Sequence, residues 1–459
     1  MKALLLNPIN LTIILIISSI YLLIALHFSS NRKNAELLEK LTISFFVFLL
    51  AGSSLFYLPY LNPANFSDLG IIQGEQKNFI VAQFLIYAVW IGIIRTSFRG
   101  FYHSAILPFR DLFLASLLLL TLFSASWSET PIVTLIGAVT LVAIAIFAAH
   151  VAKKFDWIGV SELLRWTISW IGILSFPVAL LLPGKGRYDS GSWNGILGHK
   201  NVFGALTALG AALWYIHIQE KIKSRKLKIL LVILLIIETF LSTSGGAISI
   251  LIMLFSVVLS TQIFEKLEYR SKRVFIILLV ISSVPITLGL QGSINIFLEL
   301  LGKDTNLTGR GEFWPQVIEA INKRPLLGYG YMGFWQSWRG NENPAGSIRT
   351  ITGFVPEQPH NGFLDLSTSL GYLGLALLLL SILKNFTYAV IYLGRNRGQA
   401  ASIPLVMLLY LMLRNFSEAG LWRADLDFFF YVLLTVRLNL EMKQPRTLES
   451  WKRQIHQNA

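Results

Sequence analysis

The chain has no cysteine among its 459 residues. This absence excludes disulfide scaffolds, thiol catalysis, and zinc or iron–sulfur sites built on thiolates. Charged residues are also scarce, because they make up 14% of the chain, whereas a soluble globular protein carries roughly 25%. With 54% of its residues hydrophobic, the chain has too little charge to cover a water-facing surface. We therefore predict an all-α integral membrane protein.

Acidic residues are fewer than basic residues. The chain has 25 Asp and Glu and 39 Lys and Arg, which gives a formal net charge of +14. In a soluble protein this excess would suggest a nucleic-acid partner, but in a membrane protein it first indicates orientation, so no nucleic acid is expected. The sequence also lacks a Walker loop, a GxGxxG motif before a strand, and a cluster of His, Asp and Glu with metal-ligand spacing. We expect no metal and no cofactor.

Long apolar runs divide the chain into helices that can cross a membrane. A spanning helix needs about 20 mostly apolar residues, and the runs of this length predict about 12–13 spans. The first run has no small-residue cleavage signal after it, so we interpret it as a retained span. The runs are centred near residues 9–28, 41–60, 79–95, 105–125, 131–149, 158–182, 201–217, 227–243, 246–263, 274–291, 362–383, 400–415 and 424–439.

Lys and Arg concentrate in alternate connections between these runs, as the positive-inside rule expects of cytoplasmic loops. The carboxyl-terminal tail then lies in the cytoplasm and the amino terminus lies outside. Loops as long as the one over residues 292–361 are uncommon unless they are functional. The expected organisation is transmembrane helices over 1–291, a large periplasmic loop over 292–361, further transmembrane helices over 362–439 and a cytoplasmic tail over 440–459.

The long loop contains an amphipathic pattern that predicts a helix ending before Pro325. Its opposite face is polar and includes Glu312, Gln316 and Glu319. Such a helix can lie on the outer surface of the membrane. The apolar residues that recur at helical spacing are Phe313, Trp314, Val317, Ile318 and Ile321.

Three segments on the predicted outer side combine cations with turn-forming residues, and they contain Arg187, Lys200 and Arg310. Arg, Lys and the freed backbone amides of a helix start are donors that recognise phosphate. Lys200 and Asn201 stand where a span begins, so the positive end of that helix adds to their field. The alternative is that these cations contact lipid headgroups at the interface. Their position on the side that the positive-inside rule disfavours supports phosphate recognition.

His360 stands at the boundary between the long loop and the next span, close to Glu357. Because histidine titrates near neutral pH, it can act as a general base. A single histidine can equally be structural, and the same two interpretations apply to His199.

Charged residues within predicted spans need partners, because they are costly inside a bilayer. This applies to Glu238 and Asp365, and Arg414 can pair with Glu418 four residues later. Asp425 and Asp427 have the DxD spacing that binds a divalent cation in many sugar-nucleotide transferases. Their predicted position on the outer side, where sugar nucleotides are absent, argues against that role.

Several short motifs follow one another in a fixed order along the chain. They are SWSETP at 126–131, GHKNVFG at 198–204, LSTSGGA at 241–247, LTGR at 307–310, RPLLGYGY at 324–331 and PHNGFL at 359–364. Together they span over half of the chain. Their order resembles that of the O-antigen ligase and polymerase superfamily (Wzy_C-like) of bacterial envelope membrane proteins, including exopolysaccharide polymerases of the succinoglycan type.

The resemblance implies a helical membrane glycosyltransferase of the GT-C type. Such an enzyme works without metal or nucleotide on the periplasmic face of the bacterial inner membrane, and transfer inverts the anomeric centre. The implied donor is a glycan on a polyprenyl diphosphate, usually undecaprenyl diphosphate. The implied acceptor is a glycan or a lipid-linked glycan, and a chain-length regulator is a conceivable protein partner.

The same resemblance assigns roles to individual residues. His360 corresponds to the family's loop histidine, with Glu357 as its helper or as the base itself. Lys200 and Arg310 correspond to the cations that bind the donor diphosphate, and Arg187 is a further candidate. At Gly245 the chain departs from many relatives, which carry a basic residue after the serine. Residues expected to shape the site are His199, Asn201, Asn361, Tyr329, Trp314, Arg414 and Glu418.

Three functions remain open from the sequence. The first is a polymerase that transfers a growing glycan onto a new lipid-linked repeat unit, and the aromatic-rich GYGYMGFW segment at 328–335 favours it by its resemblance to the exopolysaccharide members. The second is a ligase that transfers finished glycan to lipid A core or to a protein. The third is a transporter, which would more often show two matching halves with broken helices; the sequence has no such symmetry.

The topology can be tested with reporters that are active only outside the cytoplasm. A reporter fused within 292–361 should be active, whereas fusions after Lys228 or Lys443 should be inactive, because these two residues lie in basic connections. A cytoplasmic signal from 292–361 would remove the basis for a donor used on the outer face.

Overall fold

The fold was analysed in a computed structural model. It describes residues 32–52, 101–220, 225–265, 310–350, 353, 355–396 and 398–443, and single residues at 20, 23, 27, 271 and 274. Within these ranges every regular element is a helix, and one isolated bridge joins Arg187 to Trp193. The prediction of an all-α protein is confirmed. The predicted spans at 9–28, 79–95 and 274–291, and parts of the long loop and the tail, lie outside the described residues.

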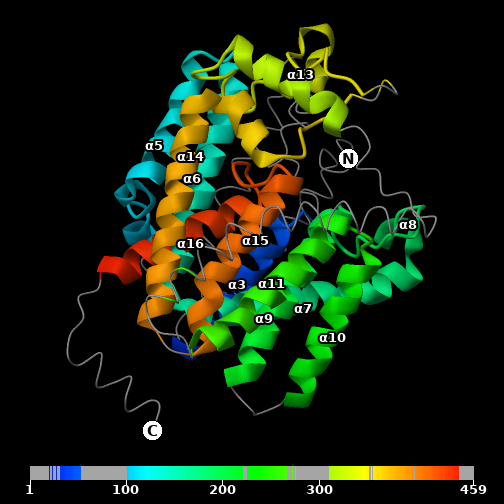
Figure 1. The fold of residues 1–459 in the computed structure, drawn as a ribbon, viewed down its shortest axis with the longest axis vertical. Helices are drawn as coiled ribbons and strands as arrows, with labels where there is room; N and C mark the ends of the chain where they lie inside the picture. Colours follow the sequence, from blue (N-terminus) through cyan, green and yellow to red (C-terminus); the bar gives the residue numbers. More distant parts are fainter. Residues whose placement is uncertain are drawn as a thin grey trace.

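The helices follow the apolar runs of the sequence (Figure 1). They are α3 (Arg32–Leu50), α5 (Leu112–Phe123), α6 (Pro131–Lys154), α7 (Trp157–Leu181), α8 (Pro183–Gly186), α9 (Lys200–Glu220), α10 (Arg225–Leu241), α11 (Gly245–Glu265), α13 (Arg310–Lys323), α14 (Gly362–Arg395), α15 (Ile403–Ser417) and α16 (Leu426–Lys443). Among the described residues, five helical stretches are long and apolar enough to cross a membrane: 131–154, 157–181, 200–218, 362–395 and 400–417. The chain is thus a multi-pass membrane protein.

Small residues allow the helices around α9 to approach closely. This helix packs against α7, α10 and α11, and its glycines lie in the contacts. A methyl group on Gly204 would overlap Ser242 and Ala247, and one on Gly210 would overlap Ile168. Membrane helices associate through this kind of close packing, because lipid tails remove the hydrophobic drive between apolar surfaces.

Helix α16 is buried along most of its length. It packs against α6, α14 and α15, and every residue from Leu426 to Leu438 is buried. A helix that is apolar on nearly all sides requires such surroundings. The buried core therefore includes α16. The turn at residues 418–425 connects this helix to the end of α15.

The amphipathic helix predicted in the long loop is confirmed as α13, but its orientation differs from the expectation. Phe313, Val317 and Ile321 are at most 3% exposed. They belong to one buried cluster with Tyr329, Phe334 and other residues of the segment that follows the helix. The apolar face of α13 is thus covered by the protein and not by the membrane surface, because the next segment of the loop supplies its own aromatic residues.

Helix α14 is broken at Gly371, which has φ +66° and ψ −169°. Only glycine adopts this backbone conformation without strain. The break frees backbone groups that the segment after α13 satisfies. Four backbone hydrogen bonds join the two segments: Tyr329 N to Thr368 O at 2.9 Å, Gly330 N to Ser369 O at 2.9 Å, Tyr372 N to Pro325 O at 2.7 Å and Leu373 N to Leu326 O at 3.3 Å.

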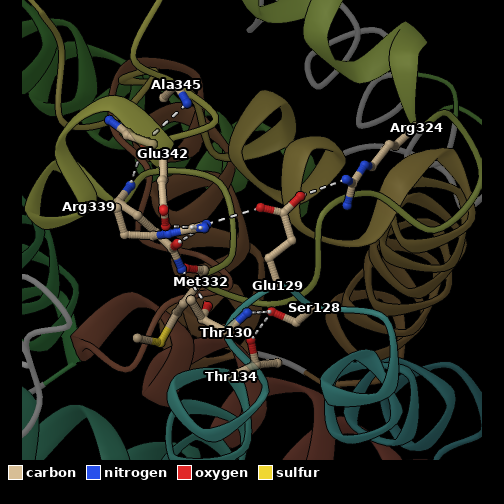
Figure 2. A network of polar contacts seen from close by, with 11 residues as sticks. Ser128, Glu129, Thr130, Thr134, Arg324, Met332, Arg339, Glu342 and Ala345 are labelled. Atoms are coloured by element: carbon tan, nitrogen blue, oxygen red, sulfur yellow. Dashed lines mark hydrogen bonds and ion pairs between the residues drawn. The ribbon is translucent and has the colours of Figure 1, made fainter. Parts of the chain in front are cut away.

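A second set of contacts fixes the same segment to the turn before α6 (Figure 2). The Glu129 carboxylate lies between Arg324, at 2.7 Å, and Arg339, at 3.1 Å. The hydrogen bond from Arg339 is the largest of the effects that lower the pKa of Glu129; burial opposes it in part. Further bonds run from Trp127 Nε1 to Leu327 O at 3.1 Å, from Gln336 Nε2 to Thr130 Oγ1 at 2.6 Å and from Thr134 Oγ1 to Tyr331 O at 2.8 Å.

The break in α14 predicts the effect of Gly371→Ala. The new methyl group would overlap the carbonyl of Leu326, and the strained backbone should lower the free energy of unfolding by about 1–3 kcal/mol. Thermal unfolding of the purified protein in detergent measures this. Gly184→Ala is the matched control, because a methyl group there meets nothing within 4 Å. Equal unfolding temperatures for the two variants would contradict the role given to Gly371.

Candidate active site

Four segments of the chain meet at the carboxylate of Glu418, which follows the last residue of α15. Asn201, in the first turn of α9, donates from Nδ2 to Glu418 Oε1 at 2.6 Å. His360, just before α14, has Nδ1 at 3.1 Å from Glu418 Oε2. Arg310, the first residue of α13, has one guanidinium nitrogen at 4.0 Å from Oε1. The sequence separates these residues widely, and the fold brings them together.

The backbone around His360 is fixed on both sides. Trp314 of α13 donates from Nε1 to the carbonyl of Pro359 at 2.8 Å. Asn361 caps α14, and its Oδ1 accepts from Phe363 N at 3.0 Å and Leu364 N at 3.1 Å. His360 itself has φ +48°, a left-handed conformation in which His and Asn are enriched among non-glycine residues. The predicted shaping residues Trp314 and Asn361 therefore hold the backbone that carries the imidazole.

The carboxylate of Glu418 is the hydrogen-bond partner of His360, and its surroundings keep it ionised. Burial alone would raise the pKa of Glu418, but the hydrogen bond and charge of His360, with the charges of His199 and Arg414, lower that pKa to about 2. The carboxylate is thus ionised at neutral pH and can accept a hydrogen bond from His360 Nδ1. In the neutral tautomer of histidine that carries its proton on Nδ1, Nε2 keeps its lone pair. The imidazole side chain is 29% exposed, so a substrate can reach it.

The start of α9 lies beside this cluster. Lys200 is the first residue of the helix, as the sequence predicted for a span beginning there. His199 Nδ1 accepts from the backbone N–H of Asn201 at 3.3 Å, and its ring lies edge-on to Tyr188 at 6.4 Å between centroids. His199 thus helps to shape the start of α9, while Asn201 reaches Glu418.

Arg414 forms its ion pair with Asp427 and not with Glu418, contrary to the pairing considered from the sequence. It also donates to the backbone carbonyl of Asn201 at 3.4 Å. Asp425 Oδ1 accepts from the backbone N–H groups of Asp427, at 3.0 Å, and Phe428, at 3.3 Å. The DxD carboxylates therefore support the start of α16 and the position of Arg414.

Three predicted site residues make their contacts outside the group of residues around Glu418. Glu357 is exposed, and Glu418 occupies the position beside His360 that we considered for Glu357. The Arg187 guanidinium lies over the ring of Trp193 at 5.0 Å. Tyr329 packs in the cluster beneath α13 and donates to the carbonyl of Ala320 at 3.0 Å. Tyr329 therefore supports α13.

The charges expected within spans differ in their surroundings. Asp365 of α14 binds Arg423 through two hydrogen bonds, at 2.8 Å and 2.7 Å. The sequence analysis did not single out Arg423, since nothing in its spacing links it to a residue 58 positions away. Glu238 of α10 is fully buried, and neither carboxylate oxygen has a hydrogen-bond partner among the described residues.

Comparisons with known proteins show two similarities, each over part of the chain. The family model described as O-antigen ligase matches residues 229–379, a range that includes Arg310 and His360. The chain is also similar to the exopolysaccharide production protein ExoQ of Rhizobium meliloti (strain 1021), with 32% identity over 95 residues. That match covers 21% of this chain and 22% of the relative's length. Residues 229–379 are thus similar to the O-antigen ligase family, and the similarity to ExoQ covers about a fifth of the length of that relative.

Proposed function

We propose that the protein is an inverting glycosyltransferase that uses a glycan on undecaprenyl diphosphate at the periplasmic face of the bacterial inner membrane. The observation that carries the proposal is the bond between His360 Nδ1 and the buried carboxylate of Glu418. This pairing leaves Nε2 as a proton acceptor in a side chain that solvent reaches. Such a base is what a sugar hydroxyl needs in order to attack.

The proposed reaction is a single displacement at the anomeric carbon. His360 Nε2 takes the proton of the acceptor hydroxyl as the hydroxyl oxygen bonds to the anomeric carbon. The bond from that carbon to the diphosphate oxygen breaks, and the diphosphate leaves with the electron pair. Glu418 stabilises the imidazolium that forms, as an oriented carboxylate does in other histidine bases. Attack opposite to the leaving group inverts the configuration.

Arg310 and Lys200 are the proposed ligands of the donor diphosphate. Each is the first residue of a helix, α13 and α9 respectively, so the positive helix end adds to each side-chain charge. Arg310 lies at 4.0 Å from Glu418, the carboxylate that holds His360. A diphosphate bound there would bring the anomeric carbon of the attached sugar close to the base. Oriented cations of this kind stabilise the charge that develops on a leaving group.

We favour a polymerase that lengthens a lipid-linked polysaccharide over a ligase. The similarity to a protein named for exopolysaccharide production supports the polymerase, while the family description supports the ligase, with lipid A core or a protein as acceptor. The two differ in the acceptor alone. Purified protein given a lipid-linked repeat unit as its single substrate should form products of two or more repeats if it is a polymerase. Transfer to lipid A core or to a protein without such products would favour the ligase.

Removal of the proposed base should abolish most of the activity. His360→Asn keeps a side chain that tolerates the left-handed backbone but supplies no base. General-base catalysis typically contributes 10²–10⁴-fold, so transfer by the folded variant should fall by about that factor. Glycan transfer from a labelled polyprenyl-diphosphate donor measures this. Activity close to that of the wild type would contradict the assignment.

Three further variants serve as controls for His360→Asn. Glu418→Gln should lower transfer by roughly 10- to 100-fold, the equivalent of a hydrogen bond to a charged group. Glu357→Gln should change it little. His150 also binds a glutamate, with Nε2 at 2.8 Å from Glu39 Oε1, but it lies in the last turns of α6 and outside the cluster. Transfer per folded molecule should therefore be unchanged in His150→Asn.

The cation hypothesis is tested by donor binding alone. Arg310→Ala should weaken the binding of a labelled polyprenyl diphosphate by about 10- to 100-fold. Arg310→Lys should weaken it too, because an ammonium cannot form a bidentate contact. Arg324→Ala is the matched control at the other end of α13, where the guanidinium pairs with Glu129. Equal affinities in the wild type and in Arg310→Ala would remove Arg310 from the donor site.

A further inference from the structure

Asn415, in the last turn of α15, is a buried amide without a hydrogen bond. The residue is 2% exposed, and neither Oδ1 nor Nδ2 has a partner among the described residues. An unsatisfied buried polar group lowers stability, whereas an apolar side chain of the same shape would not. The fold therefore gains nothing visible from an amide at this position. A buried polar group of this kind in a native structure needs an explanation, and a functional role is one of those known.

The position of Asn415 connects it to the candidate active site. It follows Arg414 and precedes Glu418 by three residues, and Glu418 is the extended residue that ends α15. Its amide packs directly against Gly362, where a methyl group would overlap the Asn415 side chain. Gly362 is the second residue after His360 and the first of α14. The C-terminal end of α15 thus places the Asn415 amide beside Gly362, and the next residue after the helix, Glu418, contacts His360.

The start of α14 supplies a second polar feature at this place. Asn361 caps the N–H groups of Phe363 and Leu364, while the N–H of Gly362 precedes the capped pair. A helix start favours electron-rich oxygen atoms. The buried amide and the helix start therefore lie side by side within two residues of the proposed base.

We propose that Asn415 is a specificity residue for the acceptor, and that its amide binds a hydroxyl group adjacent to the one that His360 deprotonates. This assignment rests on the proposed function. An amide offers one donor group and one acceptor oxygen, which matches a sugar hydroxyl, since a hydroxyl both donates and accepts. Because the amide is neutral, it is less suited to the diphosphate than Arg310 or Lys200. A site that hydrogen-bonds a hydroxyl rejects analogues that lack it.

The test compares Asn415→Leu with Asn385→Leu. Leucine keeps the approximate shape of the side chain and removes both polar groups. For Asn415→Leu, the unfolding temperature should stay the same or rise, while kcat/KM for the acceptor should fall by about 10-fold or more. Donor binding should be unchanged. Asn385 is equally buried, but it donates to Thr435 Oγ1 at 2.7 Å. Asn385→Leu should therefore unfold at a lower temperature and keep its transfer activity per folded molecule.

Monodeoxy analogues of the acceptor identify the bonded hydroxyl. One analogue should react about 10-fold or more slowly with the wild type and no more slowly than the parent acceptor with Asn415→Leu. This comparison within each protein remains valid if the variant is less stable. Equal discrimination by the two proteins would overturn the assignment, and so would a loss of donor binding in Asn415→Leu. In both cases transfer by the wild type would leave the proposed function standing. A wild type that transfers no glycan from a polyprenyl diphosphate would overturn the function, and the assignment with it.

Discussion

The broken backbone of α14 is the constraint on which the positions of α13 and of the segment after it depend. A helix interrupted at Gly371 frees carbonyl and amide groups that lipid cannot satisfy. The segment over 325–330 bonds to these groups and replaces the missing helical contacts. It can do so because Glu129 and Trp127 hold it against the start of α6. The long loop is thereby part of the transmembrane fold, and α13, which packs on this segment, acquires a fixed position.

That fixed position carries through to the candidate site. Because α13 is held, Trp314 can bond to the carbonyl before His360, and Arg310 can reach Glu418. A buried carboxylate needs partners of opposite charge or good donors, and Glu418 has Asn201 of α9, Arg310 of α13 and His360 beside it. The same requirement that makes Glu418 tolerable in the fold therefore gathers the cations and the imidazole at one place. Glu418 thus has a structural role in the fold and, in the proposed reaction, a chemical role beside His360.

Sequence reasoning succeeded where a local pattern carries the information. Apolar runs predicted α5 to α7, α9 to α11 and α14 to α16, and the apolar spacing of α13 predicted its extent up to Lys323. The start of α9 at Lys200 and the position of His360 before α14 were also predictable. The partners of these residues were not. Nothing in the spacing links Glu418 to His360, 58 residues earlier, or directs Arg414 to Asp427. Long-range pairing depends on how helices pack, and a single sequence does not encode that packing in a readable pattern.

Arg423 and Arg310 differ in how their guanidinium donors are used. Arg423 binds Asp365 through two hydrogen bonds of 2.8 Å and 2.7 Å, so its guanidinium fork is committed to a carboxylate. Arg310 approaches Glu418 at 4.0 Å, beyond hydrogen-bond distance. Its donors are therefore not taken up by Glu418, whose oxygens already accept from Asn201 and His360. An arginine held near an ionised carboxylate in this way keeps its position and still has donors for a phosphate oxygen.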